Sequence, residues 1–450
     1  MTLTVFELRR MLRNPLIWAA AVLAIALEGV RAAQWWPDLT VVTLRAVTAS
    51  TLVAGAVLVA ANLAAGRDRR FPETLAALPG RAPSRTRAVL LAAPVVGALA
   101  AAVVIVPLVL YGHLRGPAAG SLDVWEALNG VALAALAATV GAALARWTPW
   151  PFTPLLVIFA FLALIFVNGL GEYGGWALPW IPLHDPTLGP RPSALHLLYL
   201  LLLAVAIGAV ALLRHGLRLV PAAVAAVATA IAVPAIAQAD YLPKPPPVAC
   251  RQLDGLSFCP RAGYEPWVGR WAAALRPITS AVPPEALADM PALRQDTFGG
   301  LPQVWLTGVT EMSVAGRVAT GVAGLEGGPA CGKAQTVVAL WLTGLVSGLE
   351  ESAPADWTRP PDPIEKGPGW HEYPLTDSGR SSVSPGRLPG VVYDGADLVN
   401  ARALLADPGA AVKVRANWAV LTDPATTTEQ AAPLLGIAPI GGAKACGEAE

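Results

Sequence analysis

Charged residues are scarce in this 450-residue chain: they make up 14% of it, whereas apolar residues make up 55%. Soluble globular domains average about 25% charged and about 45–50% apolar residues. The shortage is greatest in residues 1–239, which hold only nine acidic and sixteen basic side chains. So little charge over that length excludes an ordinary soluble domain and favours a membrane-embedded one.

Cysteine is also scarce, and residues 1–249 contain none. Charge also divides the chain: residues 1–239 carry a formal charge of +7, whereas residues 240–450 hold 22 acidic and 16 basic side chains and carry −6. The near-zero total of +1 hides this asymmetry. Two parts so different in charge and cysteine are expected to face different surroundings.

Long apolar runs are abundant in the first part. A helix that crosses about 30 Å of hydrocarbon needs about 20 apolar residues. Seven stretches reach this length: 15–33, 44–65, 88–112, 124–145, 151–170, 194–213 and 219–238. Charge, proline or Trp/Tyr pairs bound each of them, as at membrane interfaces. The sequence therefore predicts an all-α polytopic membrane protein, with six spans in residues 15–214 and a seventh in 215–240.

Arginine sets the orientation of these spans, because short cytoplasmic loops carry the excess of basic residues. A cytoplasmic N-terminus places twelve arginines inside and only Arg31, Arg115 and Arg191 outside. The first span is not expected to be cleaved as a signal peptide, since Glu28 and Arg31 follow its basic start and no small-x-small site is present. Seven crossings then put the C-terminal part outside the plasma membrane.

The cysteines fit this placement, because disulfides persist in oxidising compartments. The preferred pairs are Cys250–Cys259 and Cys331–Cys446, although four cysteines allow three connectivities. A metal site is less favoured, because the spacing is wide and His371 is the only histidine in this part. No metal ligand set is therefore expected.

The C-terminal part is expected to be a separate domain. A proline-rich spacer at 241–250 leads into residues 251–450. Periodicity predicts a mainly helical, disulfide-bonded domain, with helices near 264–276, 333–348, 395–406 and 427–435. The last of these begins at a threonine cap near 426–427.

Two cytoplasmic segments are patterned, and the first of them, residues 1–14, is either an interfacial helix or only a topology signal. Residues 1–14 form an amphipathic helix with Val5, Leu8 and Leu12 on one face, which would lie at the membrane interface until Pro15. The loop 66–87 contains a short helix that starts near Pro72 and ends at Pro79-Gly80, with arginines on both sides.

These segments, in this order with six spans, resemble a type-two ABC transporter permease, the membrane-spanning subunit, of an actinobacterial-like kind. The string Glu-Thr-Leu-x-x-Leu-Pro followed by Arg-Thr-Arg carries the likeness, which covers residues 1–214. Glu73, Thr74, Leu75, Leu78 and Pro79 match the family's loop, and Arg81, Arg85 and Arg87 match its basic tail. The seventh span and the external domain of about 200 residues depart from the family's usual cytoplasmic end.

The resemblance implies that the N-terminal helix is an elbow helix and that the loop is a coupling helix that docks onto a separate cytoplasmic ATP-binding subunit. It implies a homodimer, or a heterodimer with a second permease, in the lipid bilayer. ATP and Mg²⁺ would bind the partner subunit, and this chain would hold no cofactor. The elbow residues are Phe6, Arg9, Arg10 and Arg13, and the residues at the ATPase are Arg69, Arg70, Glu73, Thr74, Leu75, Leu78 and Arg81.

One charged pair is expected within the membrane. Glu28 and Arg45 lie at mirror positions about the turn between the first two spans, and a bare charge in the bilayer costs about 2.5–3.5 kcal/mol or more. The pair is either a hairpin clamp, which we favour, or a polar point on a translocation path. Asn62, Asn129 and Asn168 are expected to bond neighbouring helices.

No catalytic residues are expected. Residues 327–334 follow the phosphate-loop pattern but end in Ala334 where a Ser or Thr would hold Mg²⁺. No partner nucleic acid is expected. The alternative to a transporter subunit is a membrane-anchored extracytoplasmic binding or sensor protein, with the spans as scaffold.

Overall fold

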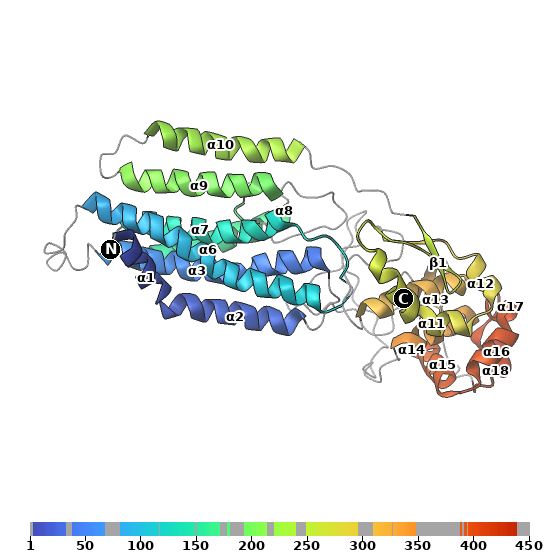
Figure 1. Ribbon diagram of the computed structural model, residues 1–450. Helices are drawn as coiled ribbons and strands as arrows, with labels where there is room; N and C mark the ends of the chain where they lie inside the picture. The colour runs from blue at the N-terminus through green and yellow to red at the C-terminus, as the bar shows by residue number, and fades with distance from the viewer. Residues whose placement is uncertain are drawn as a thin grey trace, which may run out of the picture. The chain divides into compact units, whose positions relative to one another are not determined.

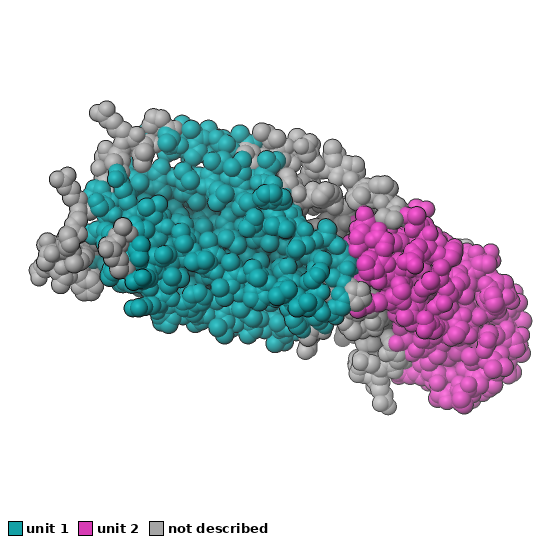
Figure 2. All heavy atoms as spheres, in the orientation of Figure 1, with its two compact units in different colours: residues 1–245 teal, residues 246–450 magenta. Residues whose placement is uncertain are grey.

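A computed structural model describes residues 3–32, 38–67, 82–116, 118–148, 150, 152–171, 178–180, 193–213, 220–239, 249–295, 309–325, 327–347, 388, 391–393 and 395–438. The chain forms two compact units, residues 1–245 and 246–450 (Figure 2). Their boundary lies within the proline-rich segment that was predicted as a spacer.

Unit 1 is a bundle of helices that run alongside one another (Figure 1). Its described helices are α1 (Leu3–Leu12), α2 (Pro15–Ala32), α3 (Leu39–Ala65), α6 (Ala82–Leu114), α7 (Val124–Trp147), α8 (Thr153–Gly171), α9 (Ser193–Leu213) and α10 (Val220–Ala239). Each of the seven apolar stretches predicted as a span falls on one of them.

Several of these helices suit insertion into a membrane. By length and composition, α3, residues 83–114 of α6, α7 and α9 can each cross one. Helices α1 and α2 meet the same test as a pair bent by 47°. Helices α8 and α10 contribute shorter apolar stretches at 153–166 and 222–232 among the described residues.

Helices α3 and α7 form the centre of unit 1, with α6 and α9 packed around them. Small residues allow this close contact. A Cβ atom added to Gly141 of α7 would lie 2.1 Å from the carbonyl oxygen of Leu58, and one added to Gly97 of α6 would lie 2.6 Å from that of Ala134. Close backbone approach through small residues is typical of helix packing in membranes.

Two helix ends differ from the prediction. Helix α3 begins at Leu39 because Asp38 caps it: the Asp38 carboxylate accepts hydrogen bonds from Thr40 N and Val41 N. Helix α6 begins at Ala82, so the last residues of the predicted loop 66–87 are helical. The second residue of α6 is a proline, and proline suits the first turn of a helix. The prediction counted only apolar residues and therefore placed the start of this helix too late.

Unit 2 combines short strands with many helices. Its elements are β1 (Arg251–Leu253), β2 (Leu256–Cys259), η2 (Glu265–Trp267), α11 (Val268–Ala281), α12 (Pro284–Ala288), β3 (Leu293–Arg294), α13 (Val309–Val322), β4 (Gly328–Pro329), α14 (Ala334–Ser347), β5 (Val391–Val392), α15 (Gly395–Ala406), α16 (Ala410–Ala416), α17 (Trp418–Leu421) and α18 (Thr428–Leu435). Strand β2 pairs antiparallel with β1 and parallel with β3.

Helix α14 lies at the core of unit 2, packed against α11, α13 and α15. Its residues 337–342 are buried on every side, and they include Trp341. A helical segment that is apolar on every face is expected to be buried on every face. This segment of α14 therefore forms the core of unit 2.

The predicted helices of unit 2 are present, but other elements were not predicted. Helix α15 has the expected bounds, and Thr427 forms a capping box with Gln430 at the start of α18. The strands were missed because they are two to four residues long and the partner of β2, β3, lies far along the chain. Helices α13 and α16 were also missed.

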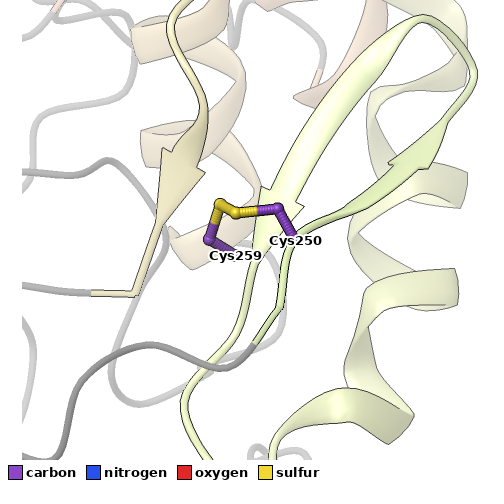
Figure 3. Close-up of a disulfide and its surroundings, with 2 residues drawn as sticks. All are labelled: Cys250 and Cys259. Atoms are coloured by element: carbon purple, nitrogen blue, oxygen red, sulfur yellow. A yellow bond between two sulfur atoms is a disulfide. The ribbon is translucent and has the colours of Figure 1, made fainter.

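The first predicted disulfide is present: Cys250 and Cys259 are bonded across the hairpin of β1 and β2 (Figure 3). Cys331 is also disulfide-bonded. Its predicted partner, Cys446, lies outside the described residues. The hairpin disulfide sits where unit 2 begins and fixes the edge of the small sheet.

Candidate functional site

The N-terminal helix α1 is set off from α2 by a sharp corner. Helix α1 ends at Leu12, and Pro15 starts α2 at an angle of 47°. The Asn14 side chain accepts a hydrogen bond from Leu16 N at 3.0 Å, and the Trp18 indole donates to the Leu12 carbonyl at 2.6 Å. The corner between α1 and α2 is therefore stabilised by two side chains in addition to Pro15.

The faces of α1 differ in part from the prediction. Glu7 and Met11 are buried, Leu8 and Leu12 are half-buried, and Val5, predicted on the apolar face, is exposed. Helix α1 packs mainly against α6. The predicted elbow residues are exposed as expected for a helix with one free face: Phe6, Arg9, Arg10 and Arg13.

A buried carboxylate lies at the centre of this contact. Glu7 is 7% exposed, and its Oε2 accepts a hydrogen bond from Arg67 Nη2 at 2.6 Å. Arg10 Nη1 lies 3.9 Å from the same oxygen. Arg67 also donates through Nε to the Ala64 carbonyl at 3.0 Å, which holds its guanidinium at the end of α3. Burial of a carboxylate is tolerated when it is paired and hydrogen-bonded in this way.

This ion pair adjoins the predicted coupling loop. Arg67 lies at the start of the predicted loop 66–87 and is the last described residue before Ala82, where α6 begins. Helix α1 is thus fixed to the residue that enters the loop and packs on the helix that leaves it. The residues predicted to contact an ATPase lie outside the described residues: Arg69, Arg70, Glu73, Thr74, Leu75, Leu78 and Arg81.

Sequence reasoning missed the role of Glu7. An acidic residue within an otherwise basic amphipathic segment was the available signal, because a lone carboxylate on a helix that lies against a membrane is costly unless a cation meets it.

Glu28 and Arg45 lie close together, as their mirror positions predict. Arg45 Nη1 is 3.9 Å from one Glu28 oxygen, and Arg31 Nη1 is 3.4 Å from the other. Glu28 is therefore shared between an arginine of its own helix and one of α3. The arrangement joins α2 to α3 and suits the clamp interpretation, which stays a prediction.

Buried asparagines join helices, as expected for membrane asparagines. Asn62 of α3 donates to the Gly141 carbonyl of α7 at 3.1 Å, and Asn129 of α7 donates to the Ser193 carbonyl of α9 at 3.2 Å. The side chain of Asn168 lies outside the described residues.

A carboxylate cluster at the start of α7 was not predicted. Asp123 caps α7 by accepting from Trp125 N and Glu126 N, and its other oxygen accepts from the Ser193 hydroxyl at 2.5 Å. Glu126 Oε2 lies 3.2 Å from the same hydroxyl. An Asp followed three residues later by Glu before an apolar run is an N-terminal capping signal that could have indicated the start of α7.

No known protein family, characterised protein or solved structure matches this chain. Functional assignment therefore depends on the residues of the chain itself.

The segment that resembles a phosphate loop, residues 327–334, is hydrogen-bonded to other parts of unit 2. Gly332 N donates to both carboxylate oxygens of the buried Asp397, at 3.1 and 3.2 Å, and the Gly332 carbonyl accepts from Thr428 N. The Gly332 amide, a backbone donor that a bound phosphate would need, is therefore already hydrogen-bonded to a carboxylate. Among the described residues, no group of three or more His, Cys, Asp or Glu side chains could hold a metal ion.

Proposed function

We propose that this chain is the membrane-spanning subunit of an ATP-binding-cassette transporter in the plasma membrane. In this proposal seven helices cross the bilayer, the N-terminus is cytoplasmic and unit 2 is extracytoplasmic. The chain pairs with a second copy or a related permease, and a separate cytoplasmic subunit hydrolyses ATP.

The ion pair between Glu7 and Arg67 supports this proposal most directly. A helix that served only as a topology signal would need no buried bond to the residue that enters a loop. A bond of 2.6 Å at this position makes α1 and the loop entrance one mechanical unit. A unit of this kind suits a surface that receives force from a partner subunit.

The mechanism follows from that connection. Closure of the ATP-binding subunits would press on residues 70–79, and the Glu7–Arg67 pair would transmit the movement to α1 and the end of α3. Helix α3 packs more extensively against α7 than against any other described helix, so a displacement of α3 would carry α7 with it. A path would then open between two protomers.

Co-purification in mild detergent with the ATP-binding-cassette ATPases of the source cell tests the proposal. The variant Glu73→Arg/Leu75→Asp changes the predicted coupling helix. The control Asp185→Arg/Leu188→Asp makes a similar charge reversal and a similar Leu→Asp change between the predicted spans 151–170 and 194–213, on the proposed external side. We expect wild type and control to retain an ATPase, identified by mass spectrometry and by ATP hydrolysis, and the coupling variant to lose it.

Failure of all three proteins to retain an ATPase would overturn the proposal. The alternative function, a membrane-anchored extracytoplasmic binding or sensor protein, has one observation in its favour: unit 2 has a compact core of its own. It predicts that changes in residues 69–81 leave function intact.

A further inference from the structure

Unit 2 contains a cavity of about 280 Å³ that is lined from three helix ends. Asp289 and Met290 follow α12, Gly321 and Gly324 lie at the end of α13, and Trp418 and Thr422 belong to α17 and its cap. The residues named from α12 and α13 come from the carboxyl-terminal end of each helix or from just beyond it, whereas Trp418 is the first residue of α17 and Thr422 follows its last.

A buried glutamine holds two of these ends together. Gln335 of α14 is 2% exposed, and its Nε2 lies within hydrogen-bond distance of three carbonyl oxygens: Ala323 at 2.9 Å, Gly324 at 3.3 Å and Thr422 at 2.8 Å. The α13 and α17 ends are thereby fixed from the core side, so the cavity has a preformed wall.

The cavity wall favours positive charge. The carboxyl-terminal end of α13, a helix of 14 residues, carries partial negative charge, and the Gln335 amide bonds to the Ala323 and Gly324 carbonyls there without adding a formal positive charge. The Asp289 carboxylate lies at the solvent-exposed edge. Among the described residues, those that line the cavity include no Lys, Arg or His.

Trp418 adds to the cavity wall a group that attracts organic cations. An indole ring attracts ammonium and guanidinium groups through its π face, and the attraction is worth about 0.5–2 kcal/mol depending on exposure. Trp418 is half-buried, and the Met290 thioether adds a polarisable apolar surface. A fully hydrated inorganic cation would gain little from either group, whereas an organic cation would gain from both.

We propose that this cavity binds a small organic cation, with the charged ammonium or guanidinium group between Asp289 and Trp418. The site lies wholly within unit 2 and does not depend on an ATPase. Gly321 lies close to the Met290 side chain: a Cβ atom added to Gly321 would lie 2.7 Å from Met290 Sδ. A larger residue at 321 would therefore push the Met290 side chain and disturb the cavity.

Isothermal titration of the full-length chain in detergent tests the site, with tetramethylammonium and methylguanidinium as probes and neopentyl alcohol as the neutral probe. We expect both cations to bind and the alcohol not to bind. Asp289→Asn and Trp418→Leu should each weaken cation binding by roughly tenfold, in line with the loss of one charge or one aromatic contact. Trp418→Phe, which keeps an aromatic face, should weaken it less.

The control is Glu285→Gln, which removes one carboxylate from α12 outside the cavity lining and should leave binding unchanged. Circular dichroism of each variant separates loss of the site from loss of folding. Equal binding of the cations and the neutral alcohol would overturn the proposal. So would equal cation binding by Asp289→Asn, Glu285→Gln and wild type.

Discussion

Glu7 and Arg67 lie 60 positions apart in the chain and form an ion pair with a nitrogen–oxygen distance of 2.6 Å. The pair fixes the N-terminal helix to the residue at which α3 gives way to the predicted coupling loop. A charge left in this contact without its partner would be poorly solvated, because Glu7 is buried.

Glu7→Gln should therefore destabilise unit 1. A hydrogen bond between charged groups contributes about 1.5–3 kcal/mol, so we expect a clear fall in the thermal midpoint of the purified chain in detergent. The exchanged pair Glu7→Arg/Arg67→Glu should recover part of the loss, since it restores the pair but sets Arg10 beside a like charge. The control Arg13→Gln removes an exposed charge just after α1 and should change the midpoint little. A midpoint for Glu7→Gln equal to that of the control would contradict this role.

Gly141→Ala should prevent α3 and α7 from packing as they do. The new methyl group would lie 2.1 Å from the Leu58 carbonyl oxygen, which is backbone and cannot rotate away. Overpacking of this kind costs about 1–3 kcal/mol or more. The measurement is the yield of monodisperse protein in size-exclusion chromatography.

Gly29→Ala provides the matched control for Gly141→Ala, since nothing lies within 4 Å of a Cβ atom at position 29. Both changes place alanine in an apolar helix, so helix propensity affects them equally. Similar yields for the two variants would show that the contact between α3 and α7 is looser than the structure has it.

Cys250→Ser/Cys259→Ser should destabilise unit 2. Closing a loop of this sequence separation, nine residues, stabilises a fold by about 2–3 kcal/mol in the chain-entropy description. The measurement is the rate of limited proteolysis of unit 2 in the full-length protein. An unchanged rate would mean that the sheet of β1, β2 and β3 holds without the bond.

The same cysteines report the orientation of the chain. If unit 2 is extracytoplasmic, a membrane-impermeant maleimide should label intact cells only after mild reduction. Labelling that requires lysis of the cells would place unit 2 inside and would contradict the proposed topology.

Asp407 makes the start of α16 sensitive to acid. Hydrogen bonds from the Lys413 ammonium and the Gly409 amide hold the pKa of the Asp407 carboxyl below its ordinary value. The folded chain therefore binds this proton less readily than the unfolded chain, whose pKa is about 3.9. The stabilisation is complete above that pH and is lost as pH falls through the folded value.

Hydrogen exchange at the Lys413 amide, which donates to the Gly409 carbonyl, measures this effect. We expect protection to fall in wild type as the pH drops below about 4, after correction for the intrinsic rate. Asp407→Asn should show, at every pH, the low protection that wild type shows only in acid. Parallel pH profiles for the two proteins would contradict the role of Asp407.

The sequence predicted the helices of unit 1 because their signal is local. A run of about 20 apolar residues is recognisable whatever its neighbours are. Helix α15 and the cap at Thr427 were predictable for the same reason, since capping depends on residues three positions apart. The bond between Cys250 and Cys259 was preferred from its short loop.

Other features could not be read from the sequence. The pairing of β2 with β3 joins segments more than 30 residues apart, and each strand is too short to show a period. The burial of Glu7 was likewise hidden, because its helical face is decided by α6, which lies 75 or more residues further along the chain. The mirror relation of Glu28 and Arg45 was an exception, since a hairpin places two adjacent helices at equal depths.

By itself, the sequence determined that this chain is helical, that its first part suits a membrane and that its cysteines lie in a separate second part. These properties follow from composition and from patterns that repeat within one element. Only the tertiary structure decided that Glu7 pairs with Arg67 and which helix ends meet around the cavity of unit 2. Both depend on contacts between segments distant in the chain, and the energy of such a contact is set by distances of a few ångströms, which no local pattern encodes.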